Sequence, residues 1–385
     1  MDYSEKSLMQ GDCLKLLKVI SSDIFQPKLV KLILLIVFGV HLIVDLLTLR
    51  ALLVNELDFK EFVFYGPVFF GSFYGMMALL TLVLKDDFIS NLKQEFRLWP
   101  LDCAGDEIYS QIKFENKIIK IFVVFNCIVT FIGSYLYFLP LDSDNETFYA
   151  VRFIEENYPD HRNLLHGLYR STFLIFGYAM TVHVYQVIYN SQHLRYQIII
   201  FTEYVASIGN PDKRKENELF YDKGFQKVVY ERLKFCIMRH QEFLVISNKK
   251  VGDMRVFIVG YSLCGCLLGI SLTFYIFSGK FYREHFPRVA VACVGAVATF
   301  WAVITAGQAI ESEYDSALST LLGKIEWYYF NDSNKKNYLV MLINLMQPWK
   351  IKFSEEYAVN YELGLGIVRA IYSIVSVVAS MHFEV

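Results

Sequence analysis

The sequence has few charged residues, few prolines and no excess of basic residues. Charged side chains make up 20% of the 385 residues, whereas a soluble domain carries roughly 25%. The 8 Pro and 21 Gly are too few for a collagen-like or a disordered chain. A formal net charge of −2 excludes the basic surface by which nucleic-acid-binding proteins are recognised. Several large classes of protein are therefore excluded before any motif is considered.

Motifs of catalysis and of metal binding are also missing. The chain contains no Walker A sequence, no GxGxxG, no HExxH and no GxSxG. His161 and His166 share a segment with acidic residues, but their spacing fits no metal motif. The 7 Cys are scattered, mostly over apolar segments, and indicate no disulfide framework. We therefore expect a protein that is not an enzyme and that holds no metal or cofactor.

Apolar residues are abundant. They account for 55% of the chain, and aromatic residues for 16%. A membrane-spanning helix needs about 20 predominantly apolar residues, and seven stretches meet this requirement. They are Leu29–Leu53, Phe62–Leu84, Ile118–Leu139, Leu168–Tyr189, Val256–Phe277, Val289–Ile310 and Tyr357–Met381. The sequence predicts an all-α membrane protein with seven transmembrane helices.

Several of these spans contain polar residues. His41 and Asp45 lie in the first span. His183 and Gln186 lie in the fourth, and Arg369 lies in the last. Such residues are costly in hydrocarbon and usually face the interior of a helix bundle or a water-filled cavity. We expect the same of these five.

Lysine and arginine are distributed unevenly over the connections. The N-terminal segment and the connections after the second, fourth and sixth spans are rich in them, whereas the opposite flanks hold only Lys60, Arg152, Arg162, Lys280 and Arg283. By the positive-inside rule, the N-terminus is cytoplasmic and the C-terminus lies outside. Asn145-Glu146-Thr147 is a glycosylation sequon on the exterior side, which makes Asn145 a candidate site for a glycan.

This topology divides the chain into six regions. In order they are a cytoplasmic N-terminal segment (1–28), four spans with an exterior loop at 140–167 (29–190), a cytoplasmic helical connection (191–254), the fifth and sixth spans (255–310), a cytoplasmic helical region (311–354) and the last span (355–385).

The region 311–354 is predicted to contain an amphipathic helix. Asn331-Asp332-Ser333-Asn334 supplies a loop and an N-cap, and Pro348 stops the helix. Apolar residues recur between them at helical spacing, namely Leu339, Leu342, Ile343 and Met346. Such a stripe packs either against the same chain or against another subunit, and the pattern favours neither.

Aromatic residues gather in the exterior halves of the spans. In the second span, Phe and Tyr alternate with Gly66, Gly71 and Gly75. Glycine beside bulky rings leaves concave, mostly apolar space that suits a small molecule. The alternative interpretation is ordinary helix packing with an aromatic belt at the membrane interface. The candidate ligand-binding residues are Tyr65, Phe69, Phe73, Gly133, Tyr137, Phe173, Gly177 and Tyr275.

The last third of the chain carries a more specific pattern. Glu326-Trp327-Tyr328 is followed by Lys335-Lys336 and by an apolar helix that ends at Gln347-Pro348. The final span then contains Arg369 three residues before Tyr372-Ser373. With the inverted seven-span topology, this pattern resembles the C-terminal signature of the insect odorant receptor family. The fourth–fifth connection is too short for the shared co-receptor, Orco, so the chain resembles an odorant-specific subunit.

The resemblance implies a non-selective cation channel gated by a small, volatile, mostly apolar ligand. It also implies a heterotetramer with Orco in the plasma membrane of a sensory dendrite, held together chiefly by cytoplasmic helices. The pore would be lined by the last span. The residues that match pore and gate positions are Ser373, Val377, Ser380 and Met381. A serine-rich face that mediates helix packing is the alternative interpretation.

Other functions stay open at this point. A gustatory-type ligand-gated channel is a close alternative, although the last span lacks that family's pattern. A G-protein-coupled receptor is disfavoured because such receptors insert with the opposite orientation. A secondary transporter would show inverted repeats with helices broken in matching places, and none is visible.

Overall fold

The computed structural model describes residues 12–54, 56–84, 99, 101, 105–209, 219–277, 283–346 and 358–382. Its α-helices are α1 (Lys15–Ser21), α2 (Lys28–Leu53), α3 (Phe59–Leu84), α6 (Asp106–Phe138), α7 (Tyr149–Asn157), α8 (Arg162–Ala206), α9 (Lys223–Phe277), α10 (Phe286–Lys324), α11 (Asp332–Met346) and α12 (Tyr361–His382). Short 3-10 helices lie between them: η2 (Asp23–Phe25), η4 (Asp144–Glu146), η5 (Pro159–His161), η7 (Arg283–His285) and η8 (Trp327–Tyr329).

Six of these helices are long and apolar enough to cross a membrane. Within the described residues they are α2, α3, α6, α8, α10 and the part of α9 over Val259–Phe277. They correspond to the first six predicted spans, and α12 coincides with the seventh. The chain is an all-α, multi-pass membrane protein.

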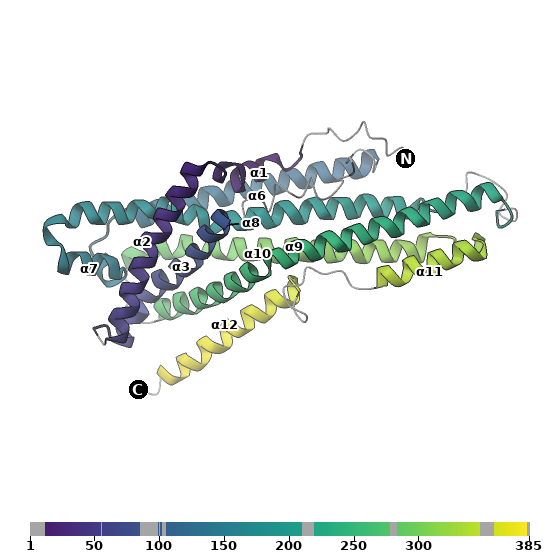
Figure 1. Ribbon diagram of the computed structural model, residues 1–385. Helices are drawn as coiled ribbons and strands as arrows, with labels where there is room; N and C mark the ends of the chain where they lie inside the picture. Colours follow the sequence, from purple (N-terminus) through teal and green to yellow (C-terminus); the bar gives the residue numbers. More distant parts are fainter. Residues whose placement is uncertain are drawn as a thin grey trace.

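Three helices are much longer than a bilayer is thick. α8, α9 and α10 contain 45, 55 and 39 residues. At a rise of 1.5 Å per residue, α9 is about 80 Å long, whereas the hydrocarbon core measures about 30 Å. The helices therefore continue beyond the membrane. The bundle is elongated, with α7 at one end and α11 at the other, and α12 lies along its side and runs toward the α7 end (Figure 1).

The helix α2 has the side-chain distribution of a membrane-embedded helix. It buries His41, Asp45 and Thr48 against its neighbours. Several of its leucines and isoleucines, among them Leu32, Ile36 and Ile43, are more than half exposed on the chain's own surface. In water this arrangement would be unfavourable, but lipid solvates apolar side chains and leaves polar groups to pair inside the bundle.

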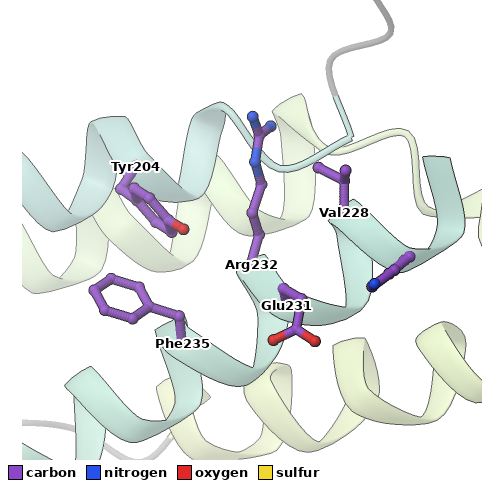
Figure 2. Close-up of a pocket in the computed structure, with 6 residues that line it drawn as sticks. Tyr204, Val228, Glu231, Arg232 and Phe235 are labelled. Carbon is purple, nitrogen blue, oxygen red and sulfur yellow. The ribbon is translucent and has the colours of Figure 1, made fainter. Parts of the chain in front are cut away.

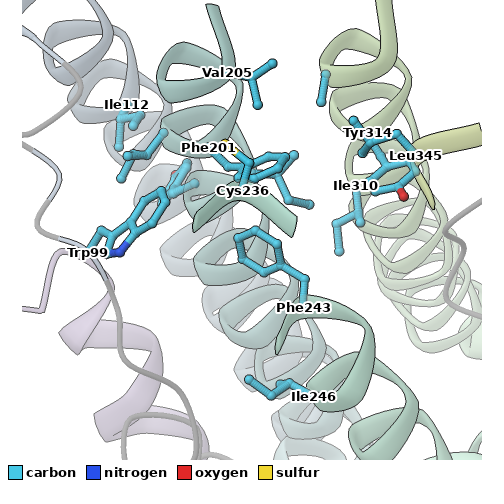
Figure 3. Packing of buried hydrophobic residues seen from close by; sticks show 14 of the residues in the cluster. Trp99, Ile112, Phe201, Val205, Cys236, Phe243, Ile246, Ile310, Tyr314 and Leu345 are labelled. Carbon is cyan, nitrogen blue, oxygen red and sulfur yellow. The ribbon is translucent and has the colours of Figure 1, made fainter. Parts of the chain in front are cut away.

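The largest hydrophobic core lies toward the α11 end. There α6, α8, α9, α10 and α11 contribute residues to one cluster that includes Ile112, Phe201, Phe243 and Ile310 (Figure 3). This half of the bundle is therefore held together by a continuous hydrophobic core within the chain. Asn331 caps α11 as predicted, because the Asn334 N–H donates to Asn331 Oδ1 at 2.9 Å, while Asp332, Ser333 and Asn334 form the first turn of the helix and not a loop.

The apolar residues of α11 divide between two faces. Tyr338, Met341 and Leu345 are buried against the same chain. Three residues of the predicted stripe point the other way, since Leu339 is 54%, Ile343 is 52% and Met346 is 63% exposed. The fourth, Leu342, is half-buried and packs against the main core. Part of the apolar surface of α11 is therefore left uncovered by this chain.

Candidate ligand site

An aromatic cluster lies near the α7 end, where α6, α8 and the loop before α7 meet. Phe173 of α8 is its centre and is buried. Its ring stacks on Tyr137 of α6 with centroids 5.7 Å apart, and it meets Phe148 edge to face at 5.8 Å. Tyr169 and His41 approach the same ring at 5.3 Å. Two sequence-predicted ligand residues, Tyr137 and Phe173, are thus in direct contact.

The predicted glycines lie beside this cluster, but they leave no open space. A Cβ at Gly177 would collide with the Oγ of Ser134, and one at Gly133 would lie 3.2 Å from Val291 Cγ1. In α3, Gly66 faces Ser271 and Gly75 faces the ring of Phe176 in the same way. These glycines allow α3, α6, α8, α9 and α10 to pack closely, so the expectation of concave space at them is wrong.

The candidate residues of α3 form a separate group. Tyr65 is buried, contacts the ring of Tyr149 in α7 and donates a hydrogen bond to the Asn145 carbonyl at 3.0 Å. Phe69 is also buried, and its ring lies 5.0 Å from that of Phe73. Phe73 itself is 38% exposed on the surface of the chain. Within this group, Tyr65 and Phe69 face the interior and Phe73 does not.

The last candidate, Tyr275, belongs to a third group. It is buried in α9, and its ring lies 6.3 Å from that of Phe64 in α3. Leu272 and Val289 complete this small cluster between α9 and α10. The eight predicted residues therefore lie in the same half of the bundle but around three separate contacts.

Polar residues of the spans are directed inward, as predicted, with one exception. Asp45 accepts a hydrogen bond from Ser72 Oγ at 2.7 Å. His41 is paired with Thr172 at 3.0 Å, and His183 with the Tyr74 hydroxyl at 2.7 Å. Gln186 is also buried and donates to a backbone carbonyl. Arg369 of α12, by contrast, is exposed on the surface of the chain.

An ion-pair cluster closes the α7 end of the aromatic cluster. Asp144 of η4 is paired with Arg170 of α8 and Arg288 of α10, and all three are buried. The guanidinium of Arg288 lies 5.7 Å from the Tyr137 ring and 5.6 Å from the Phe148 ring. Burial alone would raise the pKa of Asp144, but the hydrogen bonds from Arg288 and the Leu141 N–H outweigh it and lower that pKa below its ordinary value.

Sequence reasoning missed Phe148, Asp144 and Arg288. Asp144 and Phe148 stand in an acidic exterior segment, and Arg288 stands at the start of a predicted span, so each has an ordinary local explanation. The Asp144–Arg288 contact joins residues 144 positions apart. A local pattern in the sequence cannot predict such a pairing.

The predicted pore residues lie on the free side of α12. This helix packs on α9 and α10 through residues that include Gly364 and Ile371. Ser373, Val377 and Ser380 are exposed and, at 100° per residue, form a stripe on roughly the opposite side of the helix. The side chain of Met381 lies outside the described residues. Asn145 is exposed at the α7 end of the bundle.

A groove of about 460 Å³ opens elsewhere, toward the α11 end, between the end of α8 and the start of α9 (Figure 2). Tyr204 and Phe235 form one wall, and Lys227, Val228, Glu231 and Arg232 form the other. None of the sequence-predicted ligand residues lines it. Among the described residues, no three His, Cys, Asp or Glu side chains lie close enough together to hold a metal ion.

Comparison with known proteins gives results at the level of structure only. No protein-family model and no curated protein matches the sequence. Among solved structures, the chain is similar to the insect olfactory receptor OR5 from Machilis hrabei, with a TM-score of 0.68 and 9% identity over 95% of this chain and 96% of that one. The structure of that receptor in complex with eugenol matches with a TM-score of 0.65 and 10% identity, over 96% and 97% of the two chains.

At identities this low, the structural similarity establishes the fold alone. The chain is a multi-pass membrane protein, and its fold is that of the insect odorant receptors. The predicted resemblance to that family is confirmed at this level.

Proposed function

We propose that the chain is an odorant-specific subunit of a ligand-gated, non-selective cation channel. It binds a small, volatile, mostly apolar molecule in the half of the bundle nearest α7 and opens a pore lined by α12. One observation carries the proposal: nearly the whole chain matches an insect olfactory receptor, and a structure of that receptor holds eugenol.

The aromatic cluster supports the ligand part of the proposal. Tyr137 and Phe173 are the strongest contact candidates, because Phe173 is buried and the half-buried Tyr137 stacks on its ring. Rings offer a large apolar contact area, and the hydroxyl of Tyr137 adds one polar group. The remaining candidates lie in the same half of the bundle. Gly133 and Gly177 lie beside this contact, and Tyr65, Phe69, Phe73 and Tyr275 belong to the two other groups.

The packing of α12 supports the pore part. Its face of Ser373, Val377 and Ser380 is directed away from the chain's own helices, which leaves it available to line a shared axis. Val377 and Met381 lie one turn apart and would form an apolar ring at the gate. Such a ring closes a pore by excluding water, because an ion there cannot keep its hydration shell.

The exposed apolar face of α11 supports assembly with the co-receptor, Orco, as a heterotetramer. Leu339, Ile343 and Met346 are more than half exposed. Clustered apolar residues on a surface beyond the membrane mark a protein–protein contact.

The proposed orientation follows from the asymmetry of basic residues. The N-terminus and the regions 1–28, 191–254 and 311–354 lie in the cytoplasm of a sensory neuron, and the α7 end lies outside its plasma membrane. The membrane regions are then 29–190, 255–310 and 355–385, and loop 140–167 is exterior. Asn145 is exposed on that side and carries the proposed glycan.

The test is expression of the chain with and without Orco, with current recorded while a panel of volatile compounds is applied. We expect ligand-evoked cation current only when both subunits are present. A response that persists without Orco and depends on a G protein would contradict the channel. So would solute uptake without current, which indicates a transporter.

A further inference from the structure

The loop between α6 and α7 contributes a ring to the interior of the bundle. Phe148, directly before α7, is only 3% exposed although its neighbours Asn145 and Glu146 face outward. Its ring meets Phe173 edge to face at 5.8 Å and Tyr137 edge to face at 6.0 Å. It therefore covers the aromatic cluster at its α7 end, where three elements meet.

Phe148 is held in this position through Asp144. The Phe148 N–H donates to the Asp144 carbonyl at 2.8 Å, and the Thr147 N–H donates to the same atom at 3.1 Å. The Asp144 carboxylate is paired with Arg170 and Arg288, which belong to two different long helices. The same arginine, Arg288, lies over the Phe148 ring. The position of the ring thus depends on a buried ion-pair cluster.

We propose that Phe148 is a specificity-determining residue that touches the odorant, and that Asp144 is the positioning residue that holds it over the site. This inference rests on the proposed function. A ligand that enters between Phe148, Tyr137 and Phe173 replaces ring-to-ring contacts. An aromatic ligand restores them with its own face and edge, whereas a saturated ring of the same carbon skeleton restores only the apolar contact. Phe148 therefore favours aromatic odorants.

The experiment compares matched ligand pairs on the chain expressed with Orco. Each pair consists of an aromatic compound and its saturated counterpart, such as acetophenone and cyclohexyl methyl ketone. The panel includes ketones, esters and ethers. The measured quantity is the aromatic preference, which is the half-maximal concentration of the saturated member divided by that of the aromatic member. In the wild type we expect the aromatic member to be the more potent. Preference for the saturated members overturns the inference, as does a channel that responds only to other volatiles.

Three variants test Phe148 itself. Phe148→Leu should reduce the aromatic preference by about threefold or more, the effect of losing one aromatic contact. Phe148→Tyr keeps the ring and should preserve the preference. The matched control is Phe153→Leu, since Phe153 is half-buried in α7 and its ring contacts Tyr149 and Tyr158, outside the cluster. Equal potency ratios in Phe148→Leu and the wild type overturn the inference.

A double variant tests the role of Asp144. Asp144→Asn should lower the same ratio at normal surface expression, and it should have no further effect in the Phe148→Leu background. Independent, additive effects overturn the positioning role. If Asp144→Asn does not reach the surface, Arg288→Lys replaces it, because it keeps the charge but loses the forked geometry. If no volatile evokes current from surface-expressed wild-type channels, the proposed function itself fails, and this result is distinct from an altered ratio.

Discussion

The rings of Tyr137 in α6 and Phe173 in α8 stack with their centroids 5.7 Å apart, and His41 of α2 approaches the Phe173 ring. Each of these contacts joins side chains from different helices. Because protein interiors are closely packed, removing one ring leaves a cavity that its neighbours fill only in part. Ligand affinity at such a site depends on individual side chains. Phe73, whose ring meets that of Phe69 edge to face but is 38% exposed, is a suitable comparison.

The prediction at the residue scale contrasts these two positions. Tyr137→Ala removes the half-buried ring that stacks on Phe173 and should raise the half-maximal ligand concentration about tenfold or more, a loss of about 1.4 kcal/mol or greater. Phe73→Ala should have a clearly smaller effect. Dose–response curves at matched surface expression measure both. A larger shift at Phe73 than at Tyr137 would move the ligand site to the outer surface of α3.

The helix α12 differs from every other predicted span in how little of it the chain itself covers. It packs on α9 and α10 along one side, where Gly364 meets Ile304 and Gly269 meets Ile371. Arg369, Ser373 and Val377 are all exposed. In the proposed channel, the exposed serine-containing face of α12 lines the shared water-filled axis.

The prediction at the scale of the element concerns the gate. Val377→Ser makes the proposed apolar ring more polar and should raise the resting cation current, because it lowers the barrier to wetting. The effect should be partial, since the gate residues of Orco remain. Val368→Ser is the matched control: Val368 is 47% exposed against 58% for Val377 and lies about 180° away around the helix. Equal resting currents in the two variants would place the gate on another face.

At the scale of the whole molecule, the bundle has two halves with different means of stabilisation. Near α7 the helices turn apolar residues outward toward lipid and pair polar residues inside. Toward α11 they enclose the largest hydrophobic core. Arg195 of α8 connects three helices of this second half, because it is paired with Glu115 of α6 at 2.7 Å and with Glu313 of α10 at 2.8 Å.

The prediction at the scale of the whole molecule concerns the assembly of this chain with Orco. Ile343→Glu places a charge on the exposed stripe of α11 and should reduce the fraction of chains recovered with Orco, because burial of an unpaired carboxylate at an interface is costly. The fold should persist, since Ile343 is already 52% exposed. Ser333→Glu on the same helix is the control, because Ser333 is also exposed and lies about 80° around the helix from Ile343, and it should leave recovery unchanged. Co-purification from detergent measures the recovery of both variants with Orco. Undiminished recovery of Ile343→Glu would exclude this face of α11 as the contact with Orco.

Local sequence determined the class of the protein and its elements. Length and composition predict the spans, and the pattern of Asn331 to Asn334 predicts the start of α11. The inward direction of His41 and Asp45 also follows from sequence, because hydrocarbon leaves a polar side chain no other favourable place. These features depend on residues a few positions apart, so they can be read along the chain.

Tertiary structure alone decided what meets in the interior. It showed that Gly133 and Gly177 serve close packing, and that Phe73 faces outward. It also brought Asp144 and Phe148, from the loop between α6 and α7, to Arg288, which is far along the chain. The physical reason is that a local pattern fixes which face of a helix is apolar, whereas helix crossing and the pairing of buried charges fix which faces meet.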